Sequence, residues 1–404
     1  MFQPEKVIAA LEAKADHFAG YDGEVDAARE RYERALETLA DLSREEIDAR
    51  LAGIAWPGAR PTAEHDAHPG LVIPFEQVWL NHERARAWAK RVLTGVTTVA
   101  VDGSQITPTR TISAPVGAVQ IGWFINPHST RQPYVKDIAF EVLAPDELAD
   151  EDEAVTGFPD WRVNQRRFER ECQRLISLMQ AFHERARPET PTPVFFFDGS
   201  LILSFAAQMR PARQRPYVQA VRALLAASER YRVPVVGYVD VSYAKDLISM
   251  LGLLVGRSDK SAFSDGALLR SRMGWGDRST AWICARDDGL SQDGGPGGYY
   301  DQVAFVYLKT TADRPPARLD LPRWLLAEGE EGEDKNELER VVDVVRAECI
   351  VGNGYPYAIE TADAVAVITM QDRERFYRVF QAFIEREGLP LRFSRKMVSK
   401  RGRR

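Results

Sequence analysis

The amino-acid sequence predicts an α/β fold built on a mixed sheet, with a helical hairpin before the sheet and α+β additions after it. Residues 97–143 contain three apolar runs joined by short connections, a pattern typical of an antiparallel meander. Two later apolar runs, at 194–198 and 233–239, stand between helical stretches, and strands separated by helices are usually joined by parallel crossovers. The predicted order of elements is therefore β-β-β-α-β-α-β-α, with the first strand central and the fourth beside it.

The chain before and after the sheet divides into regions of different pattern. Residues 4–50 place apolar side chains at helical spacing among many charges, which predicts the hairpin. A proline-punctuated connector follows, and then residues 75–93 predict a further helix. We expect an N-terminal helical region over residues 1–94 that serves dimerisation or packing, a core over 95–370, and a C-terminal helix with a basic tail over 371–404.

The composition excludes several classes of protein. The net charge of −6 argues against a uniformly basic surface that coats DNA, although a local basic groove remains compatible with it. Three cysteines without CxxC spacing support neither a disulfide framework nor a zinc site. The chain has no phosphate-binding GxxxxGK[ST] motif, which disfavours an ATPase. It also has no apolar run of membrane-spanning length and no signal peptide, so we expect a cytoplasmic protein without membrane association.

Two apolar runs end in the same three residues, Asp-Gly-Ser. They read TTVAVDGS at 97–104 and VFFFDGS at 194–200. We expect Asp102 at a turn where the first strand ends, and Asp198 at the equivalent place on the neighbouring strand. Asp-Gly is also a common turn dipeptide, but two copies after apolar strands favour a pair of converging carboxylates. Carboxylate oxygens are the ligands that Mg²⁺ and Mn²⁺ take in proteins.

The helix predicted over residues 160–186 offers a third carboxylate. Its apolar stripe, at helical spacing, consists of Phe168, Cys172, Leu175 and Met179. Glu171 falls nearer the middle of that stripe than Glu169 does, so Glu171 is the preferred candidate and Glu169 the reserve. The alternative is a structural ion pair, because arginines surround both glutamates at helical spacing.

Together with a late Gly-Tyr-Pro followed by a helix, these motifs resemble the NurA family of DNA-end-resection nucleases, which have a ribonuclease H-like core. The resemblance covers residues from about 95 to 370. It implies that Asp102, Asp198 and Glu171 hold Mn²⁺, or Mg²⁺ in its place. It further implies that Tyr355 donates a hydrogen bond to the phosphate.

The sequence departs from the family pattern at two positions. Many members carry a histidine after the Gly-Tyr-Pro motif, and Asp363 stands at the corresponding place as the candidate last metal ligand. Members also often carry a lysine after the fifth strand, for which Lys245 is a loose substitute. Lys245, Ser104 and Ser200, with Glu169, are therefore reserve or substrate-contact residues.

The resemblance implies a manganese-dependent nuclease that degrades DNA from 5′ ends in the 5′-to-3′ direction and cuts single strands, in the repair of double-strand breaks. It would act on single-stranded DNA and double-stranded ends, as a homodimer with a hexameric HerA-like ATPase. Two alternatives stay open. One is another ribonuclease H-like nuclease that acts on RNA or on junctions. The other is a catalytically weak subunit that regulates a DNA-translocating ATPase, which the departures at Asp363 and Lys245 favour.

Overall fold

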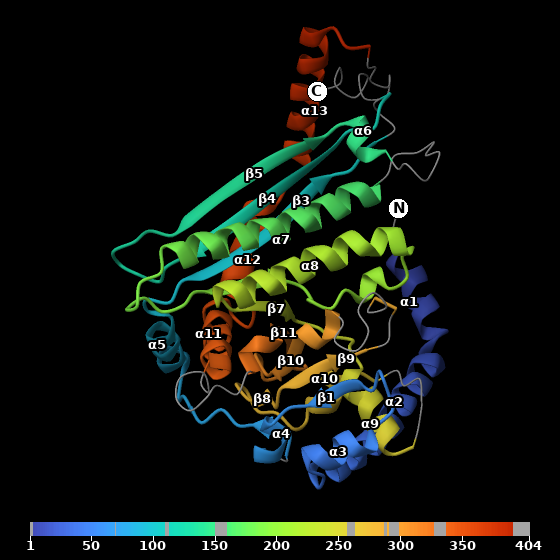
Figure 1. Cartoon of the computed structure of the whole chain (residues 1–404). Coiled ribbons are helices and arrows are strands. Elements are labelled where there is room, and N and C mark those ends of the chain that lie inside the picture. The colour runs from blue at the N-terminus through green and yellow to red at the C-terminus, as the bar shows by residue number, and fades with distance from the viewer. Residues whose placement is uncertain are drawn as a thin grey trace. The chain divides into compact units, whose positions relative to one another are not determined.

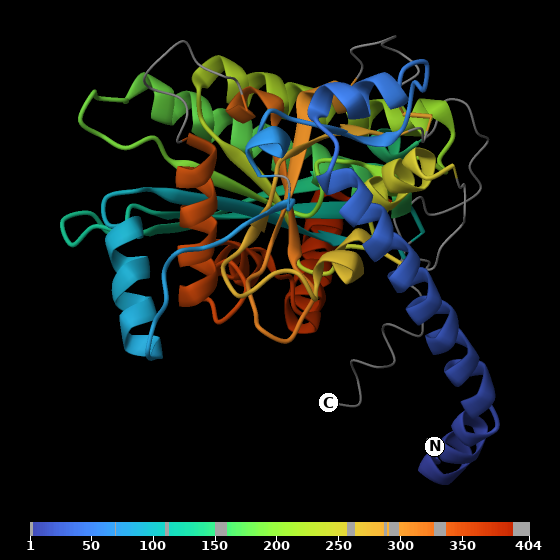
Figure 2. The same cartoon turned by 90° about the horizontal axis from the view of Figure 1, so that it is seen from below.

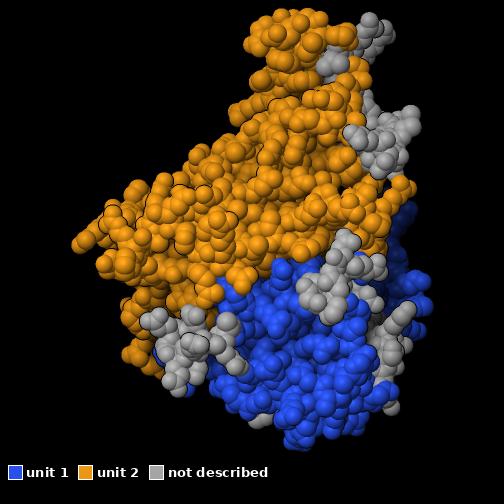
Figure 3. Space-filling view, in the orientation of Figure 1, with its two compact units in different colours: residues 1–78, 238–328 blue, residues 79–237, 329–404 orange. Residues whose placement is uncertain are grey.

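The computed structural model describes most of the chain as two compact units, coloured separately in Figure 3. One unit joins residues 1–78 to 238–328, and the other joins 79–237 to 329–404, so their boundaries differ from those of the predicted regions. The described residues are 3–68, 70–109, 113–149, 160–256, 263–286, 289–290, 299–326 and 337–390. The predicted basic tail lies outside them. Within the described residues, no helix has the length and apolar character needed to cross a membrane.

The first unit, called unit 1 here, combines helices with a set of antiparallel strands. Its helices are α1 (Pro4–Glu12), α2 (Ala15–Ala40), α3 (Arg44–Arg50), α4 (Glu64–Ala67), α9 (Asp246–Leu254) and α10 (Asp265–Leu269), with short 3₁₀ turns at Tyr299–Gln302 and Arg323–Leu326. Its strands are β1 (Gly58–Pro61), β2 (Val72–Ile73), β8 (Arg278–Ser279), β9 (Trp282–Ala285), β10 (Val303–Leu308) and β11 (Ala317–Pro322). The predicted N-terminal helices are therefore present.

The stretch predicted to be a proline-punctuated connector after those helices instead supplies two strands of unit 1. β1 pairs antiparallel with β9, and β2 pairs antiparallel with β8. The prolines in this stretch obscured the strands, because proline cannot donate to a strand ladder and usually marks a loop. In β1, Pro61 stands at the last position, opposite Trp282.

The second unit, called unit 2, contains the predicted mixed sheet. Its strands are β3 (Thr98–Ile106), β4 (Gly117–Asn126), β5 (Val135–Leu143), β6 (Val194–Asp198) and β7 (Val235–Val239), the last of which continues past the unit boundary after Gly237. Its helices are α5 (His82–Leu93), α6 (Pro145–Leu148), α7 (Asp160–Glu184), α8 (Pro211–Tyr231), α11 (Glu337–Val351), α12 (Tyr357–Ala366) and α13 (Met370–Glu387), with a 3₁₀ turn η1 at Ser204–Ala206.

The strand order in this unit is β7-β6-β3-β4-β5. β3, β4 and β5 form an antiparallel meander, whereas β3 and β6 run parallel. Helices α7 and α8 pack together on one face of these strands, and α12 lies on the other face (Figures 1 and 2). The mixed sheet predicted from the sequence is confirmed, and the first strand lies beside the fourth.

One predicted helix begins later than expected. Helix α5 starts at His82, because the Asn81 side chain accepts a hydrogen bond from Arg84 N at 3.0 Å and so caps the helix there. Residues 75–81, included in the predicted helix, are not helical. Phe75 N instead donates to the Asp277 carboxylate at 2.8 Å.

Candidate functional site

Asp102 does not lie at a turn, contrary to the prediction. Strand β3 continues through Gly103 to Ile106, because β4 pairs with it along its whole length. The parallel pairing with β6, by contrast, ends at Val101 opposite Phe197. Asp102 and Asp198 are the next residues on the two strands, so both carboxylates stand at the same end of the parallel pair.

The glycine after Asp102 lets helix α7 approach β3 closely. A Cβ atom on Gly103 would lie 2.5 Å from Glu171 Oε1 and 2.7 Å from Arg167 Cγ. Arg167 donates from one nitrogen to Glu171 Oε1 at 2.8 Å and to the carbonyl of Gly103 at 3.2 Å. Glu171 therefore reaches the strand only because residue 103 has no side chain.

A second glycine lets helix α12 approach the opposite face of the sheet. Gly122 stands opposite Asp102 in the β3–β4 pair, and a Cβ atom on it would lie 2.7 Å from Ala366 N. Residues opposite each other in an antiparallel pair share a face. The Asp102 side chain therefore leaves β3 on the face that α12 covers, while Glu171 arrives from the α7 face.

The late Gly-Tyr-Pro segment carries Tyr355 to Asp198. The Tyr355 hydroxyl donates to Asp198 Oδ1 at 2.9 Å, across 157 positions of sequence. Helix α11 ends in a tight turn in which Asn353 and Gly354 have φ of 57° and 105°. A Cβ atom on Gly352 would lie 2.0 Å from Tyr355 O, so this turn requires glycine.

A buried glutamate ties this segment to the start of β3. Glu348 is fully buried, and its carboxylate accepts hydrogen bonds from Thr98 Oγ1 at 2.9 Å and from Ala358 N at 2.8 Å. Thr98 begins β3 and Ala358 lies in the first turn of α12. The contact joins the strand of Asp102 to the helix of Asp363, and sequence reasoning did not identify it.

The carboxyl groups of Asp102, Asp198 and Glu171 have raised pKa values. Desolvation raises the pKa of Asp102 to about 6, aided by the negative charges of Asp198 and Asp363 and opposed by the Gly103 N–H and by Arg167. Desolvation likewise raises the pKa of Asp198, against the hydrogen bond from Tyr355. For Glu171, burial raises the pKa to about 8, although the positive charge of Arg167 opposes it. Raised values of this kind in a pocket are typical of functional sites.

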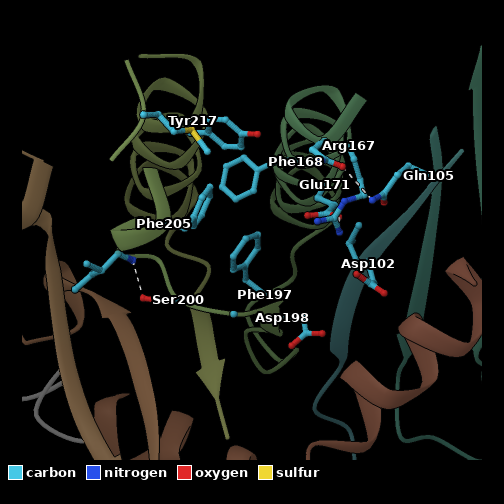
Figure 4. Close-up of a pocket in the computed structure, with 15 residues that line it drawn as sticks. Asp102, Gln105, Arg167, Phe168, Glu171, Phe197, Asp198, Ser200, Phe205 and Tyr217 are labelled. Atoms are coloured by element: carbon cyan, nitrogen blue, oxygen red, sulfur yellow. Dashed lines mark hydrogen bonds and ion pairs between the residues drawn. The ribbon is translucent and has the colours of Figure 1, made fainter. Parts of the chain in front are cut away.

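A pocket of about 640 Å³ opens beside these groups, and Figure 4 shows it. Its lining includes Asp102, Asp198 and Glu171 together with polar and aromatic side chains from β3, α7, η1 and α8. Three polar lining residues escaped the sequence analysis: Gln105, Asn164 and Arg167. Arg167 had a detectable signal, since it stands four residues before Glu171 on the same helix and so on the same face.

The remaining candidate residues are placed as follows. Asp363 is exposed on α12, with its charge acting on Asp102 and Asp198. Ser200 lines the pocket and accepts from Ile202 N at 2.9 Å. Ser104 Oγ lies on β3 outside the lining and accepts from Ile368 N at 3.3 Å.

Glu169 and Lys245 do not belong to the pocket lining. Glu169 Oε1 accepts from Gln165 Nε2 at 2.8 Å, and its other oxygen lies 3.8 Å from Arg166. Lys245 belongs to unit 1, where it precedes helix α9.

The donor chemistry of the site suits a hard divalent cation. Asp102, Asp198 and Asp363 offer carboxylate oxygens. Burial first, and the negative charges of Asp198 and Asp363 second, raise the pKa of Asp102, and a bound cation would offset both. Among the described residues, no three His, Cys, Asp or Glu side chains already form a group that could hold a metal. The fit to Mn²⁺ or Mg²⁺ rests on the carboxylate oxygens alone, which are the ligands that these ions prefer.

Comparison with solved structures finds weak overall similarity. A crystal structure of NurA with manganese matches at 9% identity and a TM-score of 0.41, covering 77% of this chain and 93% of that one. A second NurA crystal structure matches at 8% identity and a TM-score of 0.41, covering 71% and 89%. The catalytic domain of human endonuclease V matches at 13% identity and a TM-score of 0.31, covering 79% and 95%.

The sequence was also compared with curated proteins and with models of protein families. No curated protein matches the chain. The family model of the NurA domain, however, matches residues 96–368, which is more than half of the chain and includes every element of unit 2 that carries a candidate carboxylate. The chain therefore belongs to the NurA domain family.

Proposed function

We propose that this protein is a nuclease that hydrolyses phosphodiester bonds of DNA with Mn²⁺, as a 5′-to-3′ exonuclease and a single-strand endonuclease in the resection of double-strand breaks. The observation that carries the proposal is the pair Asp102 and Asp198 at the same end of parallel strands, with Glu171 and Tyr355 brought beside them. As part of the proposal we assign the sheet of unit 2 to the ribonuclease H-like class and place the protein in the cytoplasm.

Each residue has a role that follows from its position. Asp102, Asp198 and Asp363 would hold the cation, which when bound supplies positive charge and Lewis acidity at the phosphodiester. Tyr355 presents a hydroxyl donor next to Asp198 and can turn it toward a phosphate oxygen. Glu171 is held against β3 by Arg167 and can orient water or take its proton, because a pKa of about 8 permits exchange near neutral pH.

The site assignment predicts that Asp102→Ala and Asp198→Ala each lower Mn²⁺-dependent cleavage of 5′-labelled DNA by more than about 100-fold, since loss of a metal ligand costs more than loss of a supporting group. Tyr355→Phe should lower it by roughly 100-fold, as removal of a transition-state donor does. Single-stranded DNA, double-stranded DNA and RNA are compared in the same assay.

The matched control is Asp137→Ala, which removes an exposed aspartate from β5 outside the pocket. It should cleave like the wild type. Wild-type cleavage by either site-aspartate variant would refute the site, and preference for RNA would transfer the proposal to a ribonuclease.

We also propose that the protein acts as a homodimer with a hexameric HerA-like ATPase that moves the DNA. The edge strand β5 supports a dimer, because three exposed apolar residues at alternate positions share one of its faces: Ile138, Phe140 and Val142, each 47–48% exposed. Analytical ultracentrifugation measures the mass of the protein in solution and so tests the homodimer. Co-purification with the ATPase tests the complex between the two proteins. Co-purification without any DNA cleavage would favour the catalytically weak regulatory subunit instead.

A further inference from the structure

One side of the pocket is aromatic. The rings that line it belong to Phe168 on α7, Phe197 on β6, Phe205 on η1 and Tyr217 on α8. In Figure 4 these rings lie at the centre and left with Asp198 below Phe197, and the opposite side carries Asp102, Glu171, Arg167 and Gln105. The pocket therefore has an apolar aromatic side and a polar side that carries charged groups.

Phe205 differs from the other three rings in its exposure. Its side chain is 54% exposed, whereas Phe168, Phe197 and Tyr217 are 7%, 4% and 5% exposed. Phe168 and Tyr217 meet Phe205 edge-on, at centroid distances of 6.2 Å and 5.3 Å and interplanar angles of 67° and 87°. The buried rings therefore support Phe205 from the side and leave much of it open.

The backbone holds this open ring in place. The exposed Ser204 separates Phe205 from the buried segment Leu201 to Leu203, and Phe205 directly precedes the buried Ala206. Because buried residues fix the backbone before Ser204 and directly after Phe205, little backbone entropy is lost when a ligand stacks on this ring. The backbone of the 3₁₀ turn therefore keeps the Phe205 ring exposed at the pocket.

Polar groups complete the pocket on the side opposite the rings. Gln105 Nε2 donates to Asn164 Oδ1 at 3.0 Å, which leaves the remaining amide atoms able to pair with a polar edge. Arg167 adds positive charge between the amides and Glu171. The volume of about 640 Å³ lies within the range of roughly 300–1,000 Å³ found for sites that take small ligands.

We propose that the aromatic side of the pocket, with Phe205 as its open ring, binds one unpaired nucleobase of the nucleotide next to the scissile phosphate. This inference rests on the proposed function and specifies its substrate as a strand that is single at the cleavage point. A base inside a duplex has both faces covered, so it must leave the stack before it can lie on Phe205. Stacking of bases on aromatic side chains tolerates any sequence, as end resection requires.

The experiment compares Phe205→Leu with the wild type on short 5′-labelled oligothymidylates that carry a single abasic position, moved one nucleotide at a time along the strand. Leucine keeps an apolar side chain but removes the ring face. On the intact strand the variant should lose roughly 10-fold to 100-fold in kcat/KM, the loss typical of one stacked base. At one abasic position the two enzymes should converge, because the base that Phe205 contacts is already missing.

Two further variants sharpen the result. Phe205→Trp keeps a ring face and should retain the wild-type penalty for the abasic position. Tyr134→Leu removes a ring that is 61% exposed outside the pocket lining and should behave as wild type on every substrate. A loss in Phe205→Leu that is equal on intact and abasic strands, or no loss at all, would overturn the proposal.

A binding measurement separates this inference from the proposed nuclease function. Fluorescence anisotropy gives the affinities for the intact and abasic strands. Ca²⁺ replaces Mn²⁺ in this measurement, and the oligonucleotides are checked to be uncleaved. The wild type should prefer the intact strand, and Phe205→Leu should lose that preference. If no DNA is cleaved with Mn²⁺, the nuclease proposal fails, while the anisotropy still decides whether the ring binds a base.

Discussion

At the scale of single residues, the site is distinguished by a buried carboxyl group whose negative charge a neighbouring arginine only partly compensates. Glu171 is buried beside Arg167, yet desolvation outweighs that positive charge and raises its pKa to about 8. The fold thus favours the protonated carboxyl in the metal-free protein. A structural ion pair lowers the pKa of a carboxyl, as Arg170 does for Glu141 in the same unit. The contrast favours a functional role for Glu171.

This shift predicts a pH-dependent stability for the metal-free protein. The contribution of Glu171 to the free energy of unfolding is fully present below its ordinary pKa of 4.5 and is lost as the pH rises through about 8. Glu171→Gln, which stays neutral, should therefore raise the Tm relative to the wild type above that pH and much less below 4.5. Thermal unfolding in the presence of a chelator, followed across this pH range, measures the difference.

The control for this measurement is Glu169→Gln, which changes the neighbouring glutamate outside the pocket lining. Its Tm is measured at the same pH values, so that an effect of removing any glutamate from this helix can be subtracted. A constant difference for Glu171→Gln would contradict the assignment of a proton to its buried carboxyl.

At the scale of elements, two glycines decide how the helices meet the sheet. Gly103 admits α7 to one face of β3, and Gly122 admits α12 to the opposite face of the β3–β4 pair. Since Asp102 precedes Gly103 and pairs with Gly122, both close approaches converge on the same carboxylate. A helix cannot come this near a strand over a larger residue without displacing side chains.

Gly103→Ala should therefore lower nuclease activity by at least about 10-fold while the β3–β4 pairing survives. The added Cβ would lie 2.5 Å from Glu171 Oε1, so the glutamate and Arg167 must shift. The cost in stability should be about 1–3 kcal/mol, as for overpacking. Activity and the free energy of unfolding are measured together. Gly20→Ala, whose Cβ meets nothing within 4 Å, is the control, and equal activity of the two variants would refute the argument.

At the scale of the whole molecule, the chain builds each unit from two separate segments. The family match over residues 96–368 omits part of unit 1, although β1 and β2 pair with β9 and β8 inside that unit. A fragment of residues 95–370 would keep β9 but lose β1. It would thus expose the edge of a strand whose Trp282 and Cys284 are fully buried.

This arrangement predicts that the fragment of residues 95–370 aggregates or unfolds without cooperativity, as size-exclusion chromatography and thermal unfolding would show. Removal of α1 alone, in a fragment of residues 13–404, is the control, because α1 buries no residue. That shorter deletion should leave the Tm nearly unchanged. A monodisperse, cooperatively folding fragment of 95–370 would show that the strands of unit 1 do not depend on β1 and β2.

By itself, the sequence determined the elements with strong periodicity. It predicted the meander, the mixed sheet, the stripe of α7 and the strands that carry Asp102 and Asp198, because alternation and helical spacing are local properties of a chain. It also carried the family motifs, which are short and contiguous. It misread the Asp-Gly-Ser at 102–104 as a turn, because Asp-Gly favours turns in isolation, whereas these residues lie within β3.

Only the tertiary structure decided what surrounds the carboxylates. Strand β4 keeps β3 extended through Gly103. The hydrogen bond from Tyr355 to Asp198, the tie of Glu348 to Thr98 and the open ring of Phe205 join residues from separate elements. Contacts of this kind depend on the packing of whole elements, for which local propensity carries no signal. The two aspartates of the site could thus be predicted from the sequence, whereas most of the contacts that position them could not.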